Sequence, residues 1–77
     1  MTSELTWFRI NTTAADGVLA RVVVLLGTKG VRVHDLSWVV GSTGGARITT
    51  LVEHGPGRRY RLVGALSRVV DVLDIAV

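Results

Sequence analysis

Residues 14–22 read AADGVLARV and separate two segments of different periodicity. An alternating segment precedes them at residues 5–12, where Thr6, Phe8 and Ile10 point to one face of a predicted strand. An apolar segment follows at residues 18–28, with one stripe at helical spacing made of Leu19, Val22, Val23 and Leu26. We expect Asp16 to cap this helix, because its carboxylate can accept the free N–H groups of the first turn. The stretch therefore predicts a strand-to-helix turn.

The rest of the chain continues this alternation. It predicts strands at residues 31–40, 46–53 and 71–77, and a second helix at residues 58–70. A glycine-rich turn at residues 41–45 joins the second and third strands into a hairpin. The order strand–helix–strand–strand–helix–strand is typical of an α+β, ferredoxin-like βαββαβ sandwich, a four-stranded antiparallel sheet with two helices on one face. We expect one domain that spans residues 1–77.

The size of the chain suggests that it works in an assembly. It has 77 residues and no cysteine, so disulfides and zinc–thiolate sites are excluded. Its 2 histidines cannot supply a four-ligand metal site alone, and we expect neither a metal nor a cofactor. A homodimer through the sheet is the expected reinforcement. Leu5, Trp7 and Trp38 are the candidates for a sheet face that a second copy covers.

The composition also limits the cellular locations and the classes of partner that we expect. No apolar run approaches the roughly 18 residues of a membrane span, and the first residues lack a signal-peptide pattern. We therefore expect a cytoplasmic protein. The net charge of +3 is modest, and only 5% of residues are aromatic, which disfavours nucleic-acid binding. The densest charges are Arg58, Arg59, Arg61 and Arg68, which form either a solvated helix face or a docking surface for an acidic patch on a partner.

Catalytic machinery is not visible in the sequence. His34 and Asp35 are neighbours on a predicted strand, so their side chains point to opposite faces and form no dyad. His54 lies at a strand end and is expected to be exposed. Asp71 and Asp74 border the last strand and are too exposed to suggest an acid–base pair. We assign no catalytic residue and predict that the chain is not an enzyme.

Two blocks of sequence resemble a known family. They are DGVLARV at residues 16–22, followed by Leu25, Leu26, Lys29, Gly30, Val33 and Leu36, and LSRVVDVLDI at residues 66–75. They resemble the ACT domain of the small regulatory subunit of acetolactate synthase, in its short single-domain type. The resemblance implies a dimer in which two sheets join side by side. It also implies an effector amino acid, valine above all, at the interface between protomers.

Carried over by position, the resemblance implies ligand contacts from Ala14, Asp16, Gly17, Val18 and Leu19, with Arg32 and Val33 from the second strand. Ala14 and Arg32 stand where valine-sensitive relatives have asparagine. The implied function is a regulatory or activating subunit that acts allosterically on the catalytic large subunit of an amino-acid biosynthetic enzyme, with acetolactate synthase first among the candidates. The alternatives are a free-standing amino-acid-sensing protein and a nucleic-acid-binding ferredoxin-like module.

Overall fold

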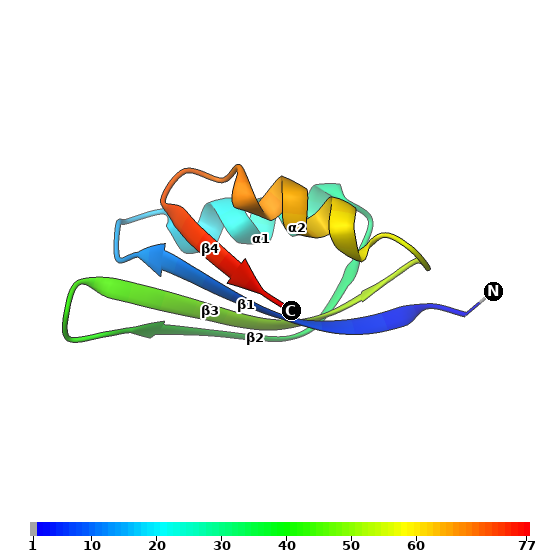
Figure 1. The fold of residues 1–77 in the computed structure, drawn as a ribbon, viewed down its shortest axis with the longest axis horizontal. Coiled ribbons are helices and arrows are strands. Elements are labelled where there is room, and N and C mark those ends of the chain that lie inside the picture. The colour runs from blue at the N-terminus through cyan, green and yellow to red at the C-terminus, as the bar shows by residue number, and fades with distance from the viewer. Residues whose placement is uncertain (1) are drawn as a thin grey trace.

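A computed structural model describes residues 2–77, and it contains the six elements in the predicted order (Figure 1). The strands are β1 (Glu4–Thr13), β2 (Arg32–Val40), β3 (Gly45–His54) and β4 (Val72–Ala76), and the helices are α1 (Val18–Thr28) and α2 (Arg59–Ser67). The ferredoxin-like prediction is thus confirmed. No helix within residues 2–77 is long and apolar enough to cross a membrane.

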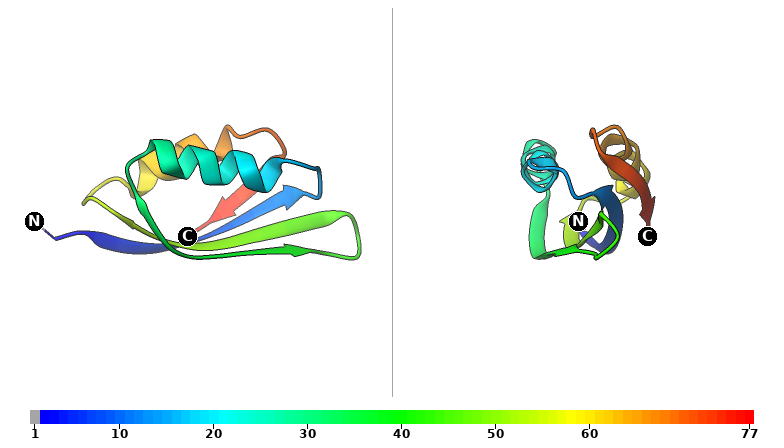
Figure 2. Two further views of the ribbon diagram at one scale, coloured as in Figure 1. Left: turned by 180° about the vertical axis from the view of Figure 1, so that it is seen from behind. Right: turned by 90° about the vertical axis from the view of Figure 1, so that its left-hand side faces the viewer.

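The sheet has the strand order β2-β3-β1-β4, and all neighbouring strands are antiparallel. Both helices lie on one face of it, and α1 sits toward β2 while α2 sits toward β4 (Figure 2). In the centre, Phe8 of β1 pairs with Thr50 of β3. The other face, called here the open face, is covered by no helix of residues 2–77.

The core lies between the helices and the sheet, and it follows the alternation of the strands. The buried apolar side chains are Phe8, Ile10, Val18, Val22, Leu26, Ala46, Ile48, Val52, Leu62 and Leu66. The buried Thr50 is satisfied because its hydroxyl donates to the backbone oxygen of Asp35 at 2.7 Å. Burial of these side chains removes apolar surface from water, which is the main favourable term in folding.

The helix α1 has the predicted bounds, but two details of its prediction are wrong. Its N-cap residue is Gly17, at φ 86°, and no side chain caps the helix, so Asp16 does not have the predicted role. Val23 is not in the core: it is 45% exposed, whereas Val18, Val22 and Leu26 are buried. Each residue turns the helix by about 100°, and this rotation places Val23 on the flank of the buried stripe.

The helix α2 is shorter than predicted, because the chain leaves helical geometry after Ser67. Two tight turns follow, in which Val69 N–H donates to Leu66 and Val72 N–H donates to Val69. Asp71 then adopts φ 75°, the left-handed region that favours glycine. These turns reverse the chain into β4.

Two side-chain positions also correct the sequence analysis. Trp38 pairs with the buried Ile48 and packs on the core, so it does not belong to the open face.

The second position is His54, which is the last residue of β3 and is only 4% exposed. Its Nε2 lies 2.7 Å from the hydroxyl of Thr6, and its Nδ1 lies 2.9 Å from the backbone oxygen of Gly55. Strand β3 runs one residue further than predicted, and this extension brings His54 onto the core side. Leu5 and Trp7, in contrast, are exposed on the open face as expected.

Candidate functional site

The loop before α1 is held by two other turns of the chain. Thr13 N–H donates to the backbone oxygen of Asp71 at 3.0 Å, and Ala14 N–H donates to that of Gly44 at 3.2 Å. Ala15 N–H donates to the hydroxyl of Thr13 at 3.3 Å. The loop therefore presents the start of α1, whose first N–H groups lack partners inside the helix, in a fixed position. A helix N-terminus carries a partial positive charge that favours an anion.

Gly17 is favoured at the start of α1 because its φ of 86° disfavours any residue with a Cβ. A Cβ there would make an ordinary van der Waals contact, 3.4 Å from Nη1 of Arg21. The Arg21 guanidinium lies across this position because its Nη2 donates to Oδ2 of Asp71 at 2.9 Å and to the backbone oxygen of Val70 at 3.4 Å. Sequence reasoning missed the ion pair of Arg21 and Asp71, since nothing in either segment indicates that the two meet.

The structure separates the predicted ligand residues into two groups. Ala14, Asp16, Gly17, Val18 and Leu19 surround the start of α1, and of these Val18 is fully buried. Arg32 and Val33 are exposed at the start of β2, opposite Glu53 and Val52. Thr13, beside the first group, pairs with Gly45 at the other end of β3. At a rise of about 3.3 Å per residue, Gly45 and Glu53 are about 26 Å apart. One chain does not bring the two groups together.

A cluster of polar side chains lies at the Arg32 end. Glu53 accepts a hydrogen bond from the Ser3 hydroxyl at 2.7 Å, and its other oxygen lies 2.6 Å from Nε2 of His34. The bond from Ser3, followed by that from His34, lowers the pKa of Glu53 from its ordinary value of 4.5. His34 thus pairs with a carboxylate across the strands, and it forms no dyad with Asp35. Sequence reasoning missed this contact, which a register shift between Val33 and Asp35 accompanies.

The four arginines around α2 fall into different environments. Arg58 is partly buried, and its Nη2 donates to the backbone oxygen of Lys29 at 3.0 Å, so it ties the end of α1 to the start of α2. Arg59 stacks over the ring of Tyr60 at 5.3 Å. Arg61 and Arg68 are exposed. Arg59, Arg61 and Arg68 remain available to a partner.

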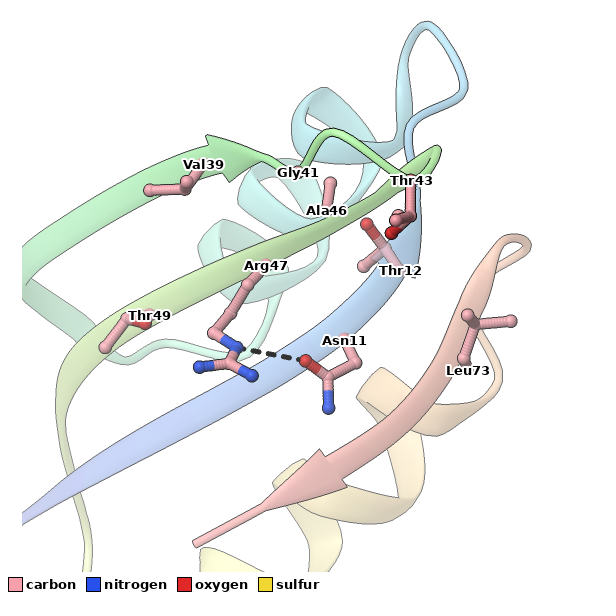
Figure 3. A pocket seen from close by; sticks show the side chains of 10 residues that line it. Asn11, Thr12, Val39, Gly41, Thr43, Ala46, Arg47, Thr49 and Leu73 are labelled. Carbon is pink, nitrogen blue, oxygen red and sulfur yellow. Dashed lines mark hydrogen bonds between the residues drawn. The ribbon is translucent and has the colours of Figure 1, made fainter.

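A shallow hollow of about 570 Å³ lies at the hairpin end of the sheet (Figure 3). Its lining includes Val39, Thr49 and Leu73 and none of the predicted ligand residues. Across it, Nε of Arg47 donates to Oδ1 of Asn11 at 3.1 Å, and Nδ2 of Asn11 donates to Asp74 at 2.7 Å. This chain of polar groups contains no nucleophile beside a base. Among residues 2–77, no group of three or more histidine, cysteine or acidic residues could hold a metal ion.

Comparison with known proteins assigns the fold. No protein-family model matches the chain, and no curated protein matches it. Its structure is similar to the crystal structure of the ACT domain from GTP pyrophosphokinase of Chlorobium tepidum, with a TM-score of 0.83 and 13% identity over 97% of both chains. A homoserine dehydrogenase from Thiobacillus denitrificans gives a TM-score of 0.77 and 12% identity, over 97% of this chain and 17% of that one.

The C-terminal domain of the MgtC protein from Mycobacterium tuberculosis is also similar, with a TM-score of 0.72 and 17% identity over 94% of this chain and 82% of that one. At these identities the likeness concerns the fold. The chain has the fold of an ACT domain, and the similarity to the Chlorobium tepidum domain covers 97% of both chains.

Proposed function

We propose that this protein is a non-catalytic regulatory module of the ACT type, which senses an amino acid and acts on a biosynthetic enzyme, acetolactate synthase first among the candidates. The observation that carries the proposal is the contact between Arg21 and Asp71. Each residue belongs to one of the two blocks that resemble the acetolactate synthase small subunit. Their ion pair joins the first turn of α1 to the residue before β4, so the two blocks are in direct contact.

A dimer accounts for the separation of the two ligand groups. In a side-by-side pair related by a twofold axis, neighbouring strands of the two protomers run in opposite directions. The Arg32 end of one protomer then approaches the Gly17 loop of its partner. The positive end of α1 favours the carboxylate of an amino acid, and Arg32 can bind a carboxylate through two parallel hydrogen bonds. Arg32 disfavours the ammonium group, so we place it at the carboxylate side.

The side of the molecule that carries β2 suits this pairing. Strand β2 is at the edge of the sheet, and an edge presents unpaired backbone groups to another chain. Leu19 and Val23 lie on the flank of α1 away from the groove that Val24, Leu25 and Val70 line beside α2. Val23 is 45% exposed, so a second copy on this side would bury apolar surface together with the strand edge.

The regulatory step is a shift in a conformational equilibrium. An effector changes the activity of a partner only as far as it binds one state of the complex better than the other. Arg59, Arg61 and Arg68 offer positive charge to an acidic surface on the catalytic subunit. The Arg59→Glu/Arg61→Glu/Arg68→Glu variant should then weaken that contact without disturbing the fold, since all three side chains are exposed.

Co-purification with a catalytic large subunit tests this proposal. The expected result is a stable complex with a thiamine-diphosphate-dependent acetolactate synthase subunit and a rise in its activity. The triple glutamate variant should lose most of the rise, while Lys29→Glu, a charge reversal at the end of α1, should retain it. A chain that binds no such subunit and leaves its activity unchanged would contradict the assignment.

A free-standing amino-acid sensor is the second candidate function. The exposed loop at Gly17 could bind an amino acid in the same way in such a sensor. It predicts that an L-amino acid raises the melting temperature of the chain alone, because a ligand that binds only the folded state stabilises it. Binding of the amino acid without any effect on an enzyme would favour this candidate over the first.

A further inference from the structure

The open face of the sheet carries charged side chains and one exposed tryptophan that the proposed function does not use. Alternation along the central strands places Trp7 and Arg9 of β1 on this face, because Phe8 and Ile10 are buried. The same alternation places Arg47 and Glu53 of β3 there, because Ile48 and Val52 are buried. Trp7 is 50% exposed although it lies on a central strand.

These side chains are arranged symmetrically about one point. Trp7 and Arg9 are each one residue from Phe8, and Arg47 and Glu53 are each three residues from Thr50. Phe8 and Thr50 are partners in the register of β1 and β3. A single line across the strands at this level therefore bisects both pairs.

We propose that the open face is a self-association surface, on which a second copy of this chain packs face to face about a twofold axis that crosses the strands at Phe8 and Thr50. The axis brings Arg47 over Glu53 of the partner subunit, and Glu53 over the partner's Arg47. It also brings Arg9 over the ring of the partner's Trp7, in both directions. A twofold axis along the strands would instead place Glu53 over the partner's Leu5, so the charge pattern selects the crosswise axis.

The charged groups are already held in place for such a contact. Arg47 donates from Nε to Asn11, which leaves its terminal nitrogens free to reach across. Glu53 is fixed by Ser3 and His34, and a carboxylate has lone pairs for a further donor. Packed sheets lie about 10 Å apart, a distance that an arginine and a glutamate span together. The charges of this face are of both signs, with Arg9 and Arg47 against Asp35, Glu53 and Asp74, which favours a second copy over a polyanion.

This inference is independent of the proposed function, because the side-by-side dimer uses the edge of β2, whereas the face-to-face contact uses side chains of β1 and β3. The two associations together would give a pair of dimers. Loss of either one leaves the other intact, so their failures can be told apart.

The test is a charge swap read by light scattering over a wide range of protein concentration. Arg47→Glu and Glu53→Arg each put like charges opposite one another twice, and each should raise the dissociation constant of the face-to-face contact at least about tenfold. The double variant Arg47→Glu/Glu53→Arg restores opposite charges and should return the constant to within about threefold of the original. Recovery in the double variant shows that the single variants fold and fail only in association.

Trp7→Ala provides a second readout and should also raise the dissociation constant, because buried tryptophans dominate interfaces. Its control is Tyr60→Ala, which removes an aromatic side chain that is 76% exposed on α2, away from the open face. The proposal is overturned if the single charge variants associate like the original chain, or if the double variant fails to recover. A chain that stays unassociated through this face but binds a polyanion, with the binding lost in Arg9→Glu, would overturn it as well.

Discussion

At the scale of single residues, Asp71 stands apart because, among residues 2–77, it is the one non-glycine residue with a positive φ. Its φ of 75° costs about 1–2 kcal/mol for a residue with a Cβ. Its carboxylate and backbone oxygen offset this cost, because they bind Arg21 and the N–H of Thr13. The residue therefore links the start of α1, the end of β1 and the start of β4.

Substitutions at Asp71 separate the strain from the ion pair. Asp71→Ala and Asp71→Gly both remove the carboxylate, but only glycine adopts this φ without a steric cost. We expect Asp71→Ala to lower the free energy of unfolding by about 1 kcal/mol more than Asp71→Gly. Urea denaturation of the two variants measures the difference. An alanine variant as stable as the glycine variant would show that the turn relaxes instead of storing strain.

Glu53 predicts a dependence of stability on pH. Its pKa is lowered in the folded protein because its charged form accepts hydrogen bonds from Ser3 and pairs with His34. A carboxyl group with a lowered pKa stabilises the fold when the pH is above its ordinary pKa of 4.5. This contribution is lost as the pH falls through the lowered pKa. Denaturation from pH 6 down to about 3 should show this loss.

The control for Glu53 is Glu53→Gln, which keeps the shape of the side chain and cannot titrate. Its stability should change less between these pH values than that of the original chain. Equal pH profiles for the two proteins would mean that the hydrogen bonds contribute nothing to stability.

Residue-level roles were the hardest to predict from the sequence. Asp16 has the chemistry of a helix cap, but the N-cap residue of α1 is Gly17, which adopts the left-handed conformation that begins the helix. His54 was predicted exposed because it precedes a glycine-rich turn, yet the alternation of β3 carries it inward to Thr6. The pair of Arg21 and Asp71 depends on tertiary structure that no local pattern encodes.

At the scale of elements, the structure shows which face of the nearly all-apolar helix α1 packs against the core. Val22 is fully buried, and the next residue, Val23, is 45% exposed, about 100° further round the helix. Periodicity gave the bounds of this helix correctly, but the run of valines left the centre of its buried stripe ambiguous by one residue. The predicted order of strands and helices was right throughout, because strand alternation and glycine turns are local signals.

These adjacent valines make a matched pair. Val22→Ala should lower the free energy of unfolding by about 2 kcal/mol, because it leaves a cavity in the core. Val23→Ala should change it by less than about 0.5 kcal/mol, as exposed positions do.

The same flank of α1 allows a test of the proposed side-by-side dimer. Val23→Glu should separate this dimer, while Val24→Glu, on the groove beside α2, should not. If Val23→Glu leaves the molar mass unchanged in light scattering, the dimer does not use this flank.

At the scale of the whole molecule, a cysteine-free chain of 77 residues has the fold of an ACT domain. Within residues 2–77, no strand pairs with the outer edge of β2 and no helix covers the open face. The edge of β2 with the flank of α1 suits a side-by-side dimer, and the open face suits a second contact. The sequence predicted the need for a partner. It could not place the two ligand groups at opposite ends of the sheet, because that separation depends on the register of β3.

A calorimetric titration of the assembled protein with L-valine, L-leucine and L-isoleucine tests the proposed effector site. We expect saturable binding of at least one of these amino acids, weakened at least about tenfold in Arg32→Ala, which removes the proposed carboxylate contact. Binding should be unchanged in Tyr60→Ala, an exposed change on α2. Absence of binding by all three amino acids, or binding that Arg32→Ala leaves unchanged, would contradict the proposed effector site.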